Sequence, residues 1–205
     1  MTWGRLLTFD ELIAASQAPK LLNKFVDCYK SAQTDGLIAL QSELSMRDLA
    51  PILPNLTLLE TTGSDIITFR LAGQKIVDTL GFNPVGQNFL DFLDPGLRET
   101  SAAGHDLMQQ HPCGYYMVYE NVYESGHRKV METLTLPLRK SLDHKNRLFL
   151  SCHIEHHLSE ISAKRGETAM VVNWKTNAFA NIGGGEPAVD LMNNVLKSLE
   201  PTTTD

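Results

Sequence analysis

The stretch that decides the fold is residues 64–91, S-D-I-I-T-F-R-L-A-G-Q-K-I-V-D-T-L-G-F-N-P-V-G-Q-N-F-L-D. It begins as a strand, because Ile67 and Phe69 lie on one face while Thr68, between them, lies on the other. After Gly73 the apolar residues change to helical spacing, and Gly81 suits the end of that short helix. Helices this short are not stable alone, so they must fold against a sheet.

Outward from this stretch, β-branched and aromatic residues separated by tight turns predict five strands. The predicted strands are residues 55–61, 65–71, 115–124, 128–138 and 147–155. One longer helix is predicted over residues 97–110, opened by Asp94-Pro95-Gly96. An isolated hairpin is marginal in water, so both groups of strands need one sheet. We therefore expect an α+β fold: a five-stranded antiparallel sheet with the short helices over one face, enclosing a cavity.

Two helices are predicted before this unit. Thr8 and Glu11 have the spacing of a capping box, and Pro19 separates a first helix from a second. The second helix has an apolar stripe at three- and four-residue spacing. Its members are Leu22, Phe25, Val26 and Tyr29. Two interpretations stay open: the stripe covers the core of its own chain, or it is a surface for a dimer or another partner.

The last part of the chain is less regular. Residues 168–174 resemble a further strand, residues 177–185 a loop and residues 187–199 an amphipathic helix. That helix docks on its own domain or is held by a partner. We divide the chain into N-terminal helices (1–36), a central domain (37–157) and a C-terminal extension (158–205).

Composition excludes several classes of protein. A net charge of −6 argues against nucleic acid as a partner, because phosphates require a basic surface. No apolar run approaches the ~20 residues that span a bilayer. The first residues lack a long apolar segment and a cleavage site, so export is not expected. Three widely spaced cysteines, Cys28, Cys113 and Cys152, suit reduced thiols in the cytoplasm.

Four short pieces carry a family resemblance. They are L-P-N-L-T-L-L (53–59), F-R-L-A-G (69–73), G-F-N-P-V-G (81–86) and E-T-L-T-L-P-L (132–138). In this order they resemble the PAS domain family, most closely its short, stand-alone bacterial members, over roughly residues 40–156. The resemblance implies a sensory or interaction domain, often a homodimer, that couples a pocket to a partner.

The family's ligands differ widely, and include haem, flavin, small acids or nothing, so the cofactor stays unknown. Flavin photosensors carry a reactive cysteine beside the ring, and residues 82–91 contain none, so a light-sensing adduct is not expected. Haem-binding members use a histidine on the longer helix, where this chain has His105. The neighbours Gly104 and Asp106 offer haem no apolar cradle.

We expect a pocket between the sheet and the helices that cover it. On residues 115–124 the alternating set that mixes apolar and acidic side chains is taken to face it, with polar groups from neighbouring strands. The candidate lining residues are Phe69, Arg70, Ile76, Leu80, Phe89, His105, Tyr116, Val118, Glu132 and Leu134. Core packing alone also accounts for these residues.

Metal and catalytic patterns are weak. His153, Glu155 and His157 share one face of the last strand, but neighbours two apart on a strand do not converge on an ion. Ser151, His153 and Glu155 have the residue types of a triad without its geometry. The run Gly183-Gly184-Gly185 lacks the Lys-Ser/Thr of a phosphate loop. We predict no metal and no catalytic residue.

The leading hypothesis is a cytoplasmic, non-enzymatic sensory or regulatory protein that acts in trans through protein contacts, with itself or a signalling partner, and that a small molecule can gate. No kinase, cyclase or helix-turn-helix pattern is recognised in the sequence. The alternatives are a receptor for a small molecule or haem, and an enzyme on a cone-shaped α+β fold of the ketosteroid-isomerase type with Glu132 as its acid.

Overall fold

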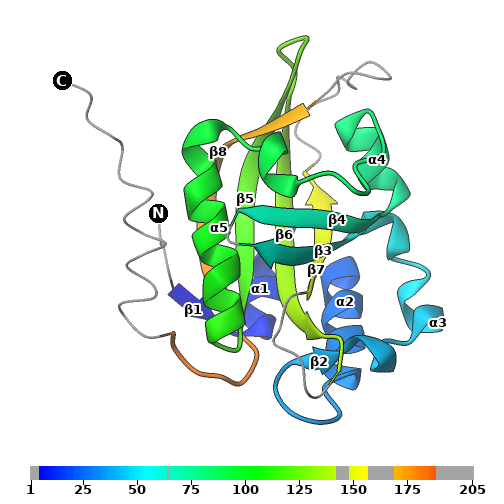
Figure 1. Ribbon diagram of the computed structural model, residues 1–205. Helices are drawn as coiled ribbons and strands as arrows, with labels where there is room; N and C mark the ends of the chain where they lie inside the picture. The colour runs from blue at the N-terminus through cyan, green and yellow to red at the C-terminus, as the bar shows by residue number, and fades with distance from the viewer. Residues whose placement is uncertain (1–4, 64, 142–147, 157–168, 188–205) are drawn as a thin grey trace.

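Strands from both halves of the chain form one sheet in the computed structural model, which describes residues 5–63, 65–141, 148–156 and 169–187. The strand order is β1-β8-β5-β6-β7-β3-β4, and β2 pairs with β6 outside this path (Figure 1). The strands are β1 (Arg5–Leu7), β2 (Ala39–Leu40), β3 (Leu56–Gly63), β4 (Ile66–Ala72), β5 (Cys113–Tyr123), β6 (Arg128–Arg139), β7 (Leu148–Glu155) and β8 (Ala169–Asn181).

The helices are short except for two. The α-helices are α1 (Phe9–Ala15), α2 (Pro19–Ser31), α3 (Met46–Leu49), α4 (Gln74–Leu80) and α5 (Pro95–Gln110), and the 3-10 turns are η1 (Gln41–Glu43), η2 (Leu53–Asn55) and η3 (Phe89–Phe92). The predicted capping box is present, since the Thr8 side chain accepts from Glu11 N at 3.2 Å and Glu11 Oε2 accepts from Thr8 N at 2.8 Å. Gly81 ends α4 in a left-handed conformation, as predicted.

The five predicted strands are neighbours in the order β4-β3-β7-β6-β5, with β4 at one edge of the sheet, and every pair is antiparallel. The join between distant parts of the chain is the pairing of β3 with β7, where Leu58 lies opposite Leu150. This confirms that the two groups of strands share one sheet.

The sheet is wider than predicted, because β8 and β1 extend it beyond β5. β8 pairs antiparallel with β5 from Cys113↔Asn181 to Tyr123↔Ala169, and β1 pairs parallel with β8. Five strands alone would leave the aromatic-rich β5 as an open edge, which invites non-specific pairing. The strand predicted over residues 168–174 is therefore confirmed and longer than expected, and the loop predicted from residue 177 begins only after Asn181.

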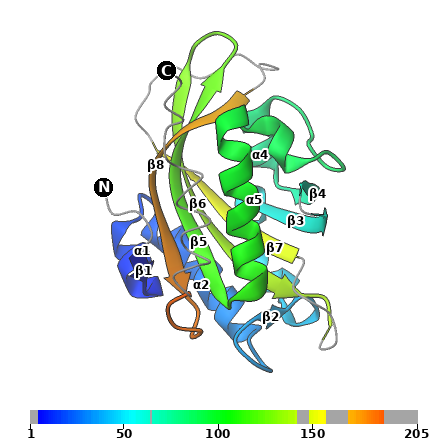
Figure 2. The same ribbon diagram turned by 60° about the vertical axis from the view of Figure 1, so that its left-hand side comes forward.

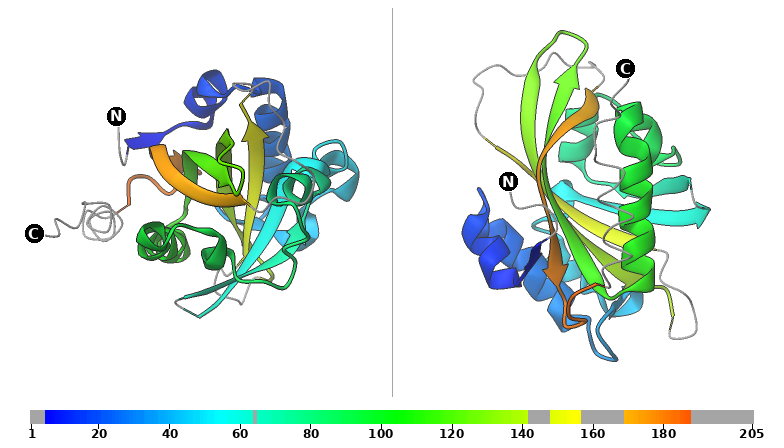
Figure 3. Two further views of the ribbon diagram at one scale, coloured as in Figure 1. Left: turned by 90° about the horizontal axis from the view of Figure 1, so that it is seen from above. Right: turned by 90° about the vertical axis from the view of Figure 1, so that its left-hand side faces the viewer.

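Helices cover both faces of the sheet, with α1 and α2 on one side and α4 and α5 on the other (Figure 3). Figure 2 shows the long strands β5, β6 and β8 curving beside α5. We call the face under α1 and α2 the closed face, which includes Tyr116, Leu134 and Leu136, and the face under α4, η3 and α5 the cavity face, which includes Tyr115 and Thr133.

The apolar stripe of α2 covers the core of its own chain, the first of the two interpretations that the sequence left open, and it is not a dimer or partner surface. All four of its side chains are fully buried, and they belong to the same apolar cluster as the leucines of the closed face; they are Leu22, Phe25, Val26 and Tyr29. Tyr29 also donates from its hydroxyl to the backbone oxygen of Pro137 at 2.8 Å. A stripe that covers a sheet within its own chain has no surface left for a second protein.

The structure bears on the membrane prediction for the described residues and leaves the C-terminal helix outside them. Among the described residues, no helix combines the length and apolar character needed to cross a bilayer. The helix predicted over residues 187–199 lies outside the described residues, apart from its first position, Pro187.

Candidate ligand cavity

A cavity of about 60 Å³ lies between the cavity face and the elements that cover it. Its cover consists of residues from α4, η3, α5 and the turn between the last two: Ile76, Thr79, Leu80, Phe89, Phe92, Leu93, Ser101, His105 and Met108. Its floor comes from six strands: Thr57, Leu59, Phe69, Tyr115, Met117, Tyr119, Asn121, Met131, Thr133, Thr135, Ser151, His153 and Val171. Segments far apart in the sequence therefore meet around one enclosed space.

The size of the cavity limits what it can hold. Pockets for drug-sized ligands occupy ~300–1,000 Å³, several times the volume found here. At ~10–15 Å³ per water, about 60 Å³ has room for roughly four to six waters. The cavity as it stands does not fit haem or flavin. None of the three cysteines lines it either, since Cys113 packs in the core beside it and the other two belong to the closed face.

His105 lines this cavity and has an unpaired ring nitrogen. The residue lies on α5 and is 7% exposed, and its ring packs edge-on to Phe149 with 4.8 Å between centroids. Nδ1 lies 2.8 Å from the Ser101 backbone oxygen, and because a carbonyl only accepts, Nδ1 must carry the proton. Nε2 is then an acceptor, and it has no partner among the described residues. Burial lowers the pKa of His105 to about 4, so the ring is neutral at pH 7.

A second histidine lies in a cluster of hydroxyl groups at the floor of the cavity. His153 Nε2 is 2.9 Å from Thr57 Oγ1, and Nδ1 is 3.0 Å from Thr133 Oγ1 and 3.4 Å from the Tyr119 hydroxyl. Asn55 holds the strand at this point by donating to the His153 backbone oxygen at 2.9 Å. Loss of water around the ring lowers the pKa of His153 to about 4, so this histidine is neutral as well.

The lining as a whole carries no charged side chain at pH 7. It contains no lysine, arginine, aspartate or glutamate, and both histidines are neutral. Burial also raises the pKa of Tyr119 to about 12, which keeps its hydroxyl protonated. Asn121 adds a second unpaired acceptor: it is 3% exposed, and its Oδ1 has no partner in the described part of the chain.

An open groove of about 380 Å³ adjoins the cavity. The two spaces share four residues, Ile76, Thr79, Met131 and His153. The groove, in contrast to the cavity, has charged side chains, which are Lys75, Asp78, Lys129 and Glu155.

Half of the predicted pocket residues surround the cavity. Those that do are Phe69, Ile76, Leu80, Phe89 and His105. The other five do not line it: Arg70, Tyr116, Val118, Glu132 and Leu134. Arg70 is exposed and its Nε donates to Glu60 at 2.6 Å, and the other four side chains belong to the closed face. Successive residues of a strand point to opposite faces. The prediction chose the wrong alternating set, so all its β5 and β6 candidates lie on the closed face instead of the cavity face.

The floor residues that sequence reasoning missed form the complementary set. On β5 they are Tyr115, Met117, Tyr119 and Asn121, and on β6 they are Met131, Thr133 and Thr135. A signal for them exists in the sequence, because β6 alternates threonine with leucine through T-L-T-L. Leucines suit a close-packed face, whereas buried threonines indicate a face where hydroxyl groups have partners or a ligand to meet.

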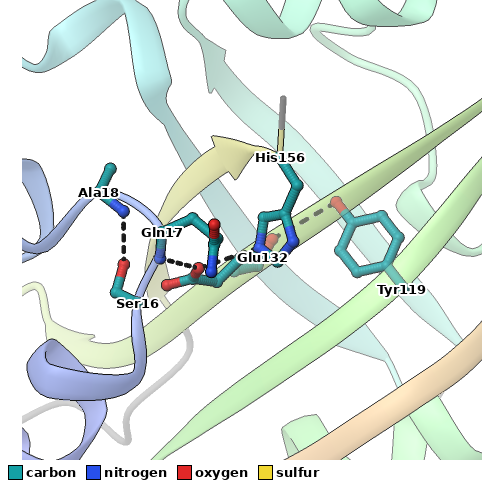
Figure 4. Close-up of polar contacts among 7 residues, drawn as sticks. Ser16, Gln17, Ala18, Tyr119, Glu132 and His156 are labelled. Atoms are coloured by element: carbon teal, nitrogen blue, oxygen red, sulfur yellow. Dashed lines mark hydrogen bonds and ion pairs between the residues drawn. The ribbon is translucent and has the colours of Figure 1, made fainter. Parts of the chain in front are cut away.

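Glu132 is buried on the closed face, which removes it as an acid in the cavity. It is 0% exposed, and its Oε2 accepts from Gln17 N at 3.1 Å and lies 3.1 Å from His156 Nε2 (Figure 4). Oε1 has no partner among the described residues. The ketosteroid-isomerase hypothesis needed this carboxylate inside the cavity, so it loses its acid.

The triad pattern does not assemble among the described residues. Ser151 bonds to Thr135 across the strands at 2.9 Å, and Glu155 pairs with Lys129 at 3.1 Å rather than with His153. His157 lies outside the described residues. Within the described ranges, no group of three or more His, Cys, Asp or Glu side chains could hold a metal ion.

Comparison with known proteins places the chain in a family. No curated protein matches it. Among solved structures, a light-oxygen-voltage domain studied with a flavin analogue has 18% identity over 56% of this chain and 84% of its own, with a TM-score of 0.42. The Vibrio cholera VqmA–ligand–DNA complex has 16% identity over 56% of this chain and 52% of its own, with a TM-score of 0.34. The family model described as PAS domain matches residues 23–152, more than half of the sequence, and the chain therefore belongs to the PAS domain family.

Proposed function

We propose that this PAS protein is a sensor whose input is a small molecule in the cavity and whose output is a contact with another protein. The observation that carries the proposal is an uncharged cavity between sheet and helices, whose lining residues include two unpaired buried acceptors, His105 Nε2 and Asn121 Oδ1. Buried polar groups are nearly always hydrogen-bonded, and leaving one unpaired costs about 1–3 kcal/mol. A bound molecule that pairs with either atom would remove that cost.

The cover of the cavity provides a route from ligand to surface. α4 has only seven residues, and its contacts with the sheet form a small apolar cluster separate from the main core. That cluster consists of Ile76, Leu80, Tyr123 and Ala169, and two of its members also line the cavity. A molecule that fills the cavity would press on α4 and η3 from beneath and change the surface that they present.

The chemistry of the lining favours binding over catalysis. A histidine with a pKa of about 4 is a weak base at pH 7, and efficient general bases have a pKa near the working pH. The three cysteines are buried, and burial raises the pKa of each thiol, so none is poised as a nucleophile. We therefore propose a non-enzymatic protein, and reduced, buried thiols suit a cytoplasmic one.

The partner is proposed to be a signalling protein or a second copy of the chain. Because the α2 stripe is buried, the contact surface must lie elsewhere, and we place it on the outer surface of α4, η3 and α5. This surface lies directly over the cavity, so occupancy can alter it without disturbing the closed face.

The test compares the same leucine substitution at two serines. Ser101→Leu adds a larger side chain at a cavity-lining position, and Ser42→Leu adds it at an exposed position of η1, away from the proposed contact surface. Protein recovered from its native cytoplasm is examined by native mass spectrometry, and partners are captured with and without the extracted small molecules. We expect wild type and Ser42→Leu to carry a bound mass that Ser101→Leu lacks, and only Ser101→Leu to stop responding to the extract. If no bound mass appears and capture is the same for all three proteins, the proposal is wrong.

A further inference from the structure

The two unpaired acceptors define which kind of molecule the cavity can receive. His105 Nε2 must accept, because Nδ1 already donates to Ser101. The amide oxygen of Asn121 is likewise an acceptor without a partner in the part of the chain that the structure describes. A molecule that satisfies either atom has to present a hydroxyl or an N–H group. A molecule with acceptors alone would leave both atoms as they are.

The absence of charge in the lining excludes ions. Moving an ionised carboxylate or ammonium out of water is costly unless an opposite charge meets it. Neither histidine nor any other lining group supplies such a charge at pH 7. In the adjoining groove, Lys129 and Glu155 are paired with each other. A charged molecule would therefore stay in the groove or in solvent.

The volume sets an upper bound on size. Room for roughly four to six waters corresponds to a ligand of about that number of non-hydrogen atoms. Three methionines among the lining residues, Met108, Met117 and Met131, are flexible side chains that adapt to the shape of a small guest. Larger cofactors would require the cover to move.

We propose that the cavity binds a small, uncharged molecule with a hydroxyl or amide N–H group that donates to His105 Nε2, as in short-chain primary amides and alcohols. The inference rests on the proposed function, because it names the class of ligand for the same cavity. His105 acts here as a binding residue that selects for a donor, and Asn121 is the second acceptor that a molecule with two donor hydrogens can satisfy.

The experiment uses three probes of the same shape: propionamide, which is neutral and donates; butanone, which is neutral and does not; and propionate, which is charged. Binding is followed by NMR of ¹³C-methyl methionine in the full chain. Met108, Met117 and Met131 report on the cavity, and Met46, which is 59% exposed, serves as an internal control. We expect propionamide to shift the three cavity methyls with about tenfold higher affinity than butanone, the gain typical of one hydrogen bond. Propionate should shift none of them.

A pair of variants assigns the effect to His105. His105→Phe keeps an aromatic ring but removes the acceptor, so propionamide should bind it no more tightly than butanone does. His111→Phe makes the same replacement at the C-terminal end of α5, outside the cavity, and should keep the tenfold preference. Because propionamide and butanone are compared on the same protein, a general loss of packing in His105→Phe would affect both equally.

The outcomes distinguish the proposed ligand class from the proposed sensor function. If propionate or butanone binds as tightly as propionamide, or if His105→Phe keeps the preference, the proposed class is wrong while a sensory cavity stands. If no probe shifts the cavity methyls, and native protein nonetheless carries a bound mass, the class is again overturned and the sensor function survives. If neither a probe nor a native molecule binds, the cavity holds water only and both proposals fall.

Discussion

The same strands have two contrasting faces: the closed face is packed for stability, and the cavity face leaves space beside polar side chains. On β6, Leu134 and Leu136 point to the closed face and are fully buried, while Thr133 and Thr135 point to the cavity face. Packing on the closed face is tight enough that a methyl group added at Gly114 would lie 2.5 Å from Leu136 Cδ2. On the cavity face, the same sheet leaves an enclosed space.

The contrast has a physical cause in how each face is covered. The closed face meets α2, whose apolar stripe lies along the sheet and excludes water. The cavity face meets α5 and the two short elements α4 and η3, a cover joined by turns, over a floor that includes threonines, tyrosines and His153. One face contributes stability through burial, and the other retains polar groups that a ligand can engage.

The largest expected effect comes from truncating a leucine on each face. Leu136→Ala should lower the free energy of unfolding by about 4 kcal/mol, because a close-packed site cannot collapse around the space left behind. Leu59→Ala, at a buried position that lines the cavity, should cost about 2 kcal/mol, since a side chain beside a void has fewer contacts to lose. Urea denaturation of both variants measures the difference. Equal costs would show that the two faces are packed alike.

Much of this architecture could be predicted from the sequence, and the reasons are local. Alternation identified β3 to β7, Gly81 marked the end of α4, and Thr8 with Glu11 marked the start of α1. What could not be predicted was the partner of β5. Its second edge is covered by β8, a strand about 50 residues further along the chain, and long-range pairing of this kind leaves no mark in local periodicity.

The cavity was predicted only in part, for a reason that concerns register. Cover residues such as Ile76, Phe89 and His105 were identified because they lie between strands in the sequence. To predict the floor residues, one must know which of two alternating sets faces the cavity. That depends on which helices cover each face of the sheet, and the sequence alone does not give their positions. Without knowing that α2 covers one face, alternation alone could not choose between the leucine set and the threonine set of β6.

The next effect comes from the buried carboxylate of the closed face. Glu132→Ala should cost about 3 kcal/mol, because Gln17 N–H and His156 Nε2 lose their shared acceptor in a buried setting. His156→Ala should cost less when Glu132 is already absent, so a double-mutant cycle should show a coupling of about 1–2 kcal/mol. Additive costs in that cycle would mean that the pair contributes nothing as a unit.

The cavity face should make stability depend on pH. His105 and His153 have pKa values lowered to about 4 from an ordinary 6.5, so the unfolded chain binds more protons between these values. Stability should therefore be constant above about pH 6.5 and decline as pH falls toward 4. The ceiling is about 3 kcal/mol per histidine, and His153 should contribute less because it is partly exposed. Urea denaturation at several pH values measures this decline, and His105→Phe should flatten it. If the pH dependence of the free energy of unfolding is the same in His105→Phe as in wild type, His105 is not the source of the decline.

The smallest expected effect comes from two substitutions that add volume, one on each face, and they compare the packing of the faces most directly. Ala178 is fully packed on the closed face, so Ala178→Leu should force neighbours apart and cost about 1–3 kcal/mol. Ser101 lines the cavity, so the side chain of Ser101→Leu enters existing space and should change the free energy of unfolding by less than about 1 kcal/mol. Thermal and urea denaturation of both variants test this. A stable Ser101→Leu protein that no longer binds a small molecule would show that the hollow face is dispensable for folding, and a strongly destabilised one would show that the space is already filled.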